Sequence, residues 1–181
     1  MTRSAILRFL TLAAVLLTVL LGGCGFRLEG DRPLPPALNS VYIDLVYPYH
    51  VATPALETAL QERIIASGGT VKSDIAQATS VLRLSGFSVT QETLAVGPDG
   101  TAIEYRLVVS VNFELRSAGK ILIAQQSQGV SRSYSFTATE ILAKEAEEQR
   151  LENFMQSDLA QLILLRVEAE LAHSNGAAVA S

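Results

Sequence analysis

Strict alternation of apolar and polar residues is the clearest pattern in the chain, and it runs through residues 103–115. Polar residues such as Glu104, Ser110 and Asn112 separate apolar residues that recur at every second position. A period of two predicts a long strand with one buried face. That face would carry Ile103, Tyr105, Leu107, Val109, Val111, Phe113 and Leu115.

Three further segments predict strands. β-branched and aromatic residues fill positions 41–47, and Pro48 ends that run. In 81–94 the apolar residues change parity across Gly86, which predicts a β-bulge at this glycine. The run 121–134 is rich in Gln and Ser, which indicates an edge or half-exposed strand.

Two segments show the three- and four-residue spacing of amphipathic helices. In the first, Thr53 is the expected N-cap, Pro54 the first helical residue and Gly68-Gly69 the stop. In the second, Thr137 and Glu140 fit a capping box. The first stripe comprises Leu56, Leu60 and Ile64, and the second comprises Leu151, Met155, Leu159, Leu162, Ile163, Arg166 and Ala169.

The order strand, helix, three strands, helix predicts an α+β fold with two helices packed on one face of a four-stranded sheet. Turns at Gly97–Gly100 and Ala118-Gly119 would join the long strands as antiparallel neighbours. The strand–helix–strand beginning allows one parallel pair. The sheet is therefore expected to be mixed and mostly antiparallel.

The N-terminus has the parts of a secretory signal peptide: Arg3 and Arg8, then an apolar run from Phe9 to Leu21. That run is shorter than the roughly 20 residues needed to span a bilayer. The chain's single cysteine follows in Leu21-Gly22-Gly23-Cys24, which resembles the lipobox of bacterial lipoproteins. The alternative is an ordinary signal peptide with an incidental cysteine.

In the lipoprotein class, cleavage precedes the cysteine, which then carries a diacylglycerol and an N-terminal acyl chain. Two or more chains anchor a protein stably, whereas one does so marginally. Gly25 is not the aspartate associated with inner-membrane retention, so the resemblance points to the outer membrane. The expected organisation is a signal peptide at 1–23, a lipidated tether at 24–40, one domain at 41–172 and a disordered tail at 173–181.

Composition argues against nucleic acid as a partner. The net charge is −4, and removal of Arg3 and Arg8 makes the mature chain more acidic, whereas phosphate binding rests on basic side chains. His50 and His173 have no metal-ligand spacing, and no nucleophile motif occurs. We expect no enzyme activity, no metal, and no cofactor beyond the covalent lipid on Cys24.

A small cationic corner is the remaining candidate site. Arg132 lies near the end of the last predicted strand and Lys144 near the start of the last helix, so a tight connection would bring them together. The alternative is that Lys144 pairs with Glu140 or Glu148, four residues away on the helix. The residues alone do not favour one over the other.

Several short motifs, taken in order, resemble the LPS-assembly lipoprotein family, LptE. They are Cys24-Gly25-Phe26-Arg27-Leu28, Leu34-Pro35, Glu104-Tyr105 at the start of the long strand, and Leu142-Ala143-Lys144 with Glu147 and Met155. The resemblance implies two helices on a four-stranded mixed sheet. It also implies a plug within the LPS-assembly β-barrel protein LptD, and insertion of lipopolysaccharide into the outer leaflet.

The family's lipopolysaccharide-contacting lysine matches Lys144. A second basic residue that members can carry before the Glu-Tyr strand has no counterpart, because Gly97-Pro98-Asp99 occupies that turn. The resemblance therefore assigns ligand binding to Lys144, with Arg132 beside it. The alternative function is a free outer-membrane lipoprotein that binds a small ligand or supports the envelope.

Overall fold

A computed structural model describes residues 34–46, 54–135 and 141–179, without the side chains of residues 141–145 and 175–179. The predicted signal peptide, the anchor at Cys24 and the capping box at Thr137 and Glu140 lie outside the described residues. The predicted start of the first helix is wrong by one residue, because Pro54 and not Thr53 is the N-cap and the helix begins at Ala55.

The described residues form one mixed sheet in the strand order β2-β1-β3-β4-β5. β1 pairs in parallel with β2 and β3, whereas β3–β4 and β4–β5 are antiparallel. The α+β prediction is confirmed, with five strands in place of four. The missed strand, β2, has three residues, too few to show a period. The strands are β1 (Ser40–Leu45), β2 (Thr70–Lys72), β3 (Ser80–Val96), β4 (Ala102–Ser117) and β5 (Lys120–Ser135).

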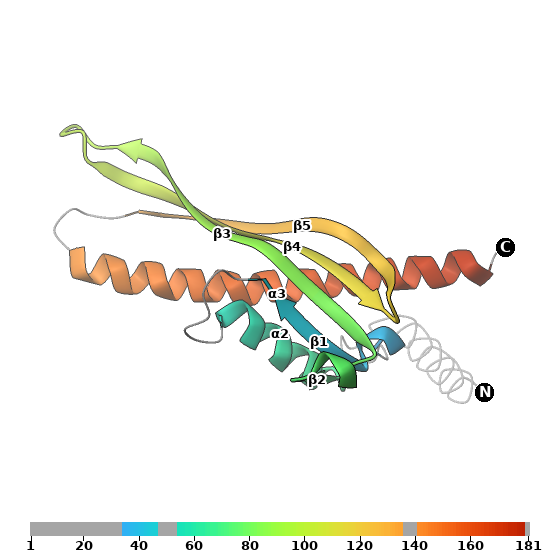
Figure 1. The fold of residues 1–181 in the computed structure, drawn as a ribbon. Coiled ribbons are helices and arrows are strands. Elements are labelled where there is room, and N and C mark those ends of the chain that lie inside the picture. Colours follow the sequence, from blue (N-terminus) through green and yellow to red (C-terminus); the bar gives the residue numbers. More distant parts are fainter. Residues whose placement is uncertain (1–33, 47–53, 136–140, 180–181) are drawn as a thin grey trace, which may run out of the picture. The chain divides into compact units, whose positions relative to one another are not determined.

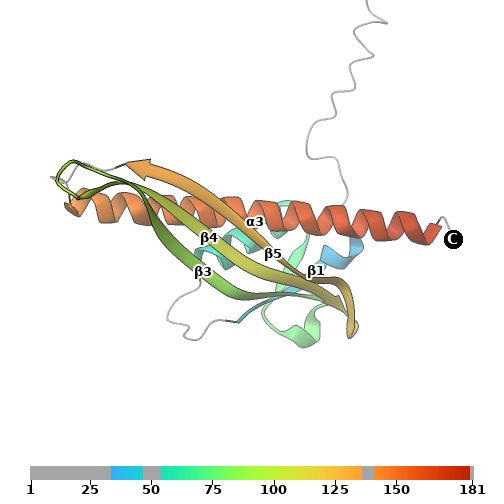
Figure 2. The same cartoon turned by 90° about the horizontal axis from the view of Figure 1, so that it is seen from above.

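Both helices lie on one face of the sheet, as predicted (Figure 1). α2 (Ala55–Ala66) connects β1 to β2, and α3 (Ile141–Val179) packs against α2, β4 and β5. β5 lies over α3 in both views (Figure 1, Figure 2). Two short 3₁₀ helices, η1 (Pro36–Leu38) and η2 (Ile75–Gln77), precede β1 and β3.

The alternation in β4 places its apolar residues in the core, as the sequence predicts. The side chains of Leu107, Val109, Val111, Phe113 and Leu115 are buried against the helices. Ile103 is exposed, because the β3–β4 hairpin projects beyond the part of the sheet that the helices cover (Figure 1). The helix-facing surface therefore ends before the hairpin tip.

A bulge at Gly86 keeps the apolar residues of β3 on one face of the sheet, although they change from even to odd positions along the sequence. The pairing of β3 with β4 shifts between Ser85 and Ser88, and Gly86 lies in this bulge with a φ of +61°. A Cβ on Gly86 would lie 2.9 Å from Asn112 Nδ2, closer than van der Waals contact allows. The predicted bulge is confirmed. Both the positive φ and the lack of space for a Cβ favour glycine at position 86.

The described parts of two segments predicted to be irregular contain helical structure. Within the expected tether, η1 forms a turn, and Leu38 is fully buried in the core. Within the expected tail, α3 continues to Val179. The His173 ring bonds the Ala169 carbonyl and the Ser174 hydroxyl donates to the Leu171 carbonyl, so both side chains bond to the backbone of the helix itself.

The predicted stripe of α3 is correct in its first half and wrong in its second. Met155, Leu159 and Ile163 are buried, but Leu162, Arg166 and Ala169 are exposed. All four residues from 162 to 165 are apolar, so their spacing does not identify the buried face. The actual buried set continues through Leu164, Val167 and Leu171, because α3 packs on both α2 and the sheet.

Candidate functional site

The two residues proposed as a ligand site lie on different elements, Arg132 on β5 and Lys144 on α3. Lys144 lies in the first turn of α3, and its side chain is outside the described part of the structure. Arg132 lies in β5 opposite Leu107 of β4, a pairing that puts it on the helix-facing side of the sheet. Of these two positions, only the side chain of Arg132 has a described environment.

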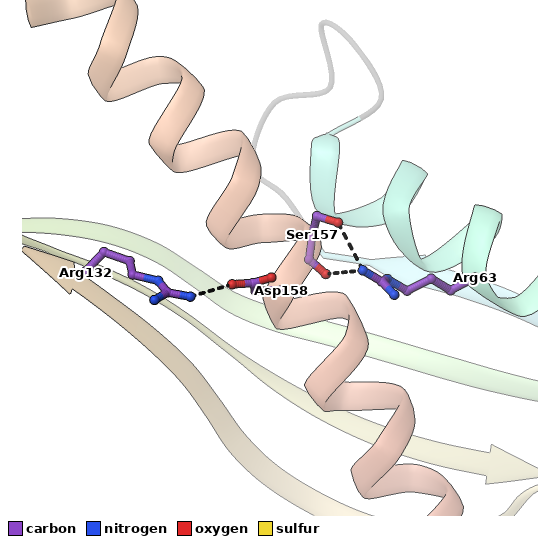
Figure 3. Close-up of polar contacts among 4 residues, drawn as sticks. All are labelled: Arg63, Arg132, Ser157 and Asp158. Carbon is purple, nitrogen blue, oxygen red and sulfur yellow. Dashed lines mark hydrogen bonds and ion pairs between the residues drawn. The ribbon is translucent and has the colours of Figure 1, made fainter. Parts of the chain in front are cut away.

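α3 holds the Arg132 guanidinium through an ion pair and an aromatic ring. Its Nη2 lies 3.0 Å from Asp158 Oδ2, and a dashed line in Figure 3 marks this ion pair. Its Cζ lies 5.8 Å from the centre of the Phe154 ring. The Arg132 side chain remains 54% exposed, so the ion pair contributes little stability, about 0–1 kcal/mol. The contact therefore sets the position of the guanidinium but adds little to the stability of the packing between β5 and α3.

This contact places Arg132 away from the position expected for a cationic corner. Fourteen residues separate positions 144 and 158 on α3, or about 21 Å of helix axis at 1.5 Å per residue. The described partner of Arg132 is Asp158, and the corner with Lys144 stays a prediction, because the Lys144 side chain lies outside the described residues.

A polar seam joins β3, β5 and α3 closer to the start of the helix. The Gln91 side-chain amide donates to the Tyr134 hydroxyl, and the Tyr105 and Tyr134 rings stack with centroids 5.6 Å apart. Burial raises the pKa of Tyr134, and the nearby Glu148 carboxylate raises this pKa further. Glu148, the possible partner of Lys144, thus lies beside the Tyr134 hydroxyl.

Contacts that the sequence did not suggest fix α3 against α2. The buried Gln156 Oε1 accepts a hydrogen bond of 2.9 Å from the Leu56 backbone N–H, in the first turn of α2. Nearby, Arg63 Nη2 donates to the carbonyl and the hydroxyl of Ser157 (Figure 3). Pro54 is the N-cap residue and supplies no side-chain acceptor, so Gln156 of the other helix takes that role.

Replacement of Gln156 by Leu tests this cap between the helices. The change leaves the buried Leu56 N–H without a partner and is expected to lower the free energy of unfolding by about 1–3 kcal/mol. Chemical denaturation measures the loss. Gln149→Leu, on an exposed part of the same helix, is the control and should change stability by less than about 0.5 kcal/mol. Equal losses would exclude the cap.

The β3–β4 turn is closed by its own polar groups. The Asp99 carboxylate accepts from the Thr101 backbone N–H at 3.1 Å and from its hydroxyl at 2.9 Å, and these bonds lower the pKa of Asp99. The Gly100 amide donates to the Gly97 carbonyl at 3.0 Å. The turn contains a single charged residue, the acidic Asp99, and resembles a hairpin turn more than an anion site.

The described residues contain no group of three or more His, Cys, Asp or Glu side chains arranged to hold a metal ion. Within the same ranges, no helix has both the length and the apolar character needed to cross a membrane.

Comparison with known proteins defines the class to which this fold belongs. The family model of the LptE lipopolysaccharide-assembly family matches residues 38–167, which is most of the chain. The chain therefore belongs to the LptE family. The match includes all five strands, α2 and most of α3.

Individual relatives agree with this assignment. The LPS-assembly lipoprotein LptE of Yersinia enterocolitica is 29% identical over 96% of this chain and 84% of its own length. That of Photorhabdus laumondii is 28% identical over 87% and 84%. The solution structure of lipoprotein B from Nitrosomonas europaea is 27% identical, covers 80% of this chain and 91% of its own, and has a TM-score of 0.63.

Proposed function

We propose that this chain is a non-enzymatic, outer-membrane subunit of the lipopolysaccharide translocon. In this proposal its domain is a plug within the LPS-assembly β-barrel protein LptD. Membership of the lipopolysaccharide-assembly family carries the proposal. The lipobox-like sequence before Cys24 supports attachment of the domain to a membrane by acyl chains.

The face of the sheet opposite the helices has the composition that a plug requires. Its register brings short polar side chains together across neighbouring strands, and the Ser88 and Ser110 hydroxyls lie 2.9 Å apart. The interior of a large membrane barrel is polar, so such a face can be satisfied by side chains of the lumen. The face includes Ser110, Asn112 and Glu114 of β4 and Ser127, Ser131 and Ser133 of β5.

An affinity pull-down from detergent-solubilised membranes tests the plug. The proposal predicts that the tagged chain recovers the barrel protein in comparable molar amounts and retains it through washing. Recovery of the chain without the barrel would instead favour a free lipoprotein that binds a small ligand or supports the envelope.

Lys144 is the proposed contact for a lipid A phosphate, and Arg132 is assigned to its ion pair with Asp158. Lys144→Gln removes a charge-assisted hydrogen bond and should weaken lipopolysaccharide binding about tenfold or more, measured with purified lipopolysaccharide at moderate salt. Arg132→Gln removes the same charge and is the matched control, expected to change affinity by less than about threefold. Equal losses, or none, would remove Lys144 from this role.

A further inference from the structure

β5 is the last strand of the sheet, and the middle of its outer edge has few of the features that usually protect an edge strand. From Gln126 to Ser135 it pairs with β4 without a register shift, so the backbone groups on its other side form a regular row. Natural proteins block such edges with charged residues, prolines or bulges. Within this stretch, residues 126–131 contain no charged residue and no proline, and the register shifts of β5 lie before Gln126.

Exposed apolar side chains of α3 lie beside this edge. Phe154, Leu162 and Leu165 are 56%, 38% and 47% exposed, and we call them the outer ridge. Arg132 of β5 contacts Asp158, and Gln126 accepts a hydrogen bond of 3.1 Å from Arg166. Residues 126–132 of β5 thus run along the same part of α3 as the outer ridge.

The charge-free stretch 126–131 of the edge and the outer ridge have similar lengths. Residues 154 to 165 of α3 span about 16 Å at 1.5 Å per residue, which corresponds to about five residues of strand at 3.3 Å each. A strand added beside β5 would continue the sheet over α3. Every second side chain of that strand would then point toward the outer ridge.

Charge favours a protein strand over a lipid phosphate as the occupant. Arg132 lies 3.0 Å from Asp158 and Arg166 lies 3.0 Å from Glu170, so each guanidinium beside the outer ridge has a carboxylate partner. The surface is complementary to an uncharged segment. An anionic headgroup would have to displace a carboxylate from each arginine.

From these features we infer that β5 accepts a strand of the barrel partner by edge addition. The added segment alternates apolar residues, which cover the outer ridge, with polar residues on the opposite face. This inference rests on the proposed function, because it assigns the barrel protein as the source of the strand. To the proposed function it adds the contact surface, which is the edge of β5 and the outer ridge, and the mode of contact, which is strand addition.

Hydrogen exchange of the intact chain, alone and in the co-purified complex, tests the edge addition. Peptides covering Gln126–Ser135 should exchange at least about tenfold more slowly in the complex, since newly bonded amides are protected. A photoreactive residue at Ser133 should crosslink to a barrel segment with alternating polarity. Leu165→Glu should lower recovery of the barrel at least about tenfold, because it puts a charge against the apolar strand.

Ile65→Glu is the matched control, since Ile65 is an apolar residue, 59% exposed, on α2, and α2 packs against α3 and against β2 at the opposite edge of the sheet from β5. It should leave barrel recovery unchanged, and thermal melting should show both variants folded. If the wild-type chain recovers no barrel protein, the proposed function fails and the inference fails with it.

If the barrel is recovered but β5 exchanges equally in both states, only the edge addition is overturned. Protection of β5 in the concentrated chain alone would assign the edge to a second copy. Protection by lipopolysaccharide alone would assign it to lipid. Either result would also overturn the inference.

Discussion

Val111→Asp is expected to unfold the domain or to lower its free energy of unfolding by about 4 kcal/mol or more. Val111 is 1% exposed at the centre of β4, so the new carboxylate would be buried under the helices without a partner. Chemical denaturation of the purified protein, followed by circular dichroism, measures the loss.

Ser110→Asp is the control for this change, one residue away and on the opposite face of β4. Its side chain is half-buried beside the Ser88 hydroxyl, and water can reach the new charge. The expected loss is below about 1 kcal/mol. Equal losses at the two positions would show that the helices do not cover the Val111 face.

Cys24→Ala is expected to abolish acylation and, with it, stable attachment to the membrane. Each buried methylene contributes about 0.8 kcal/mol to anchoring, so loss of all the acyl chains removes most of the free energy of membrane attachment. Mass spectrometry of the mature protein and fractionation of membranes measure the two effects. Cys24→Ser is a second variant with near-identical size and the same expected loss. An unmodified Cys24 thiol in the wild-type protein would contradict the anchor.

Sequence patterns that extend over many residues predicted most of the fold. The alternation in β4 extends over 13 residues, from 103 to 115, and only one register puts its apolar side chains against the helices. The parity change at Gly86 likewise has one simple explanation, a bulge. Such patterns are read locally, because the strand itself carries the periodicity.

The errors arose where the structure depends on contacts between distant segments. β2 exists because Thr70–Lys72 pairs with β1, and its own sequence has no strand period. The second half of the α3 stripe is set by α2 and the sheet together. An apolar run such as residues 162–165 allows several faces, and the face left over forms part of the outer ridge.

The candidate site was less predictable than the fold for the same reason. Arg132 and Asp158 are 26 residues apart, and Gln156 and Leu56 are 100 residues apart. No spacing rule relates such residues before the helices are placed. Lys144 was noted for its place near Arg132 in the sequence, but only resemblance to a family favoured it as a ligand contact over a partner of Glu140 or Glu148.

Depletion of this chain in the bacterium that encodes it tests its role in lipopolysaccharide assembly most directly. Newly made lipopolysaccharide is pulse-labelled, and the inner and outer membranes are separated by density. We expect that labelled lipopolysaccharide stops reaching the outer membrane and accumulates before it, and that the wild-type chain restores delivery. Delivery at an unchanged rate in fully depleted cells would contradict the proposed function.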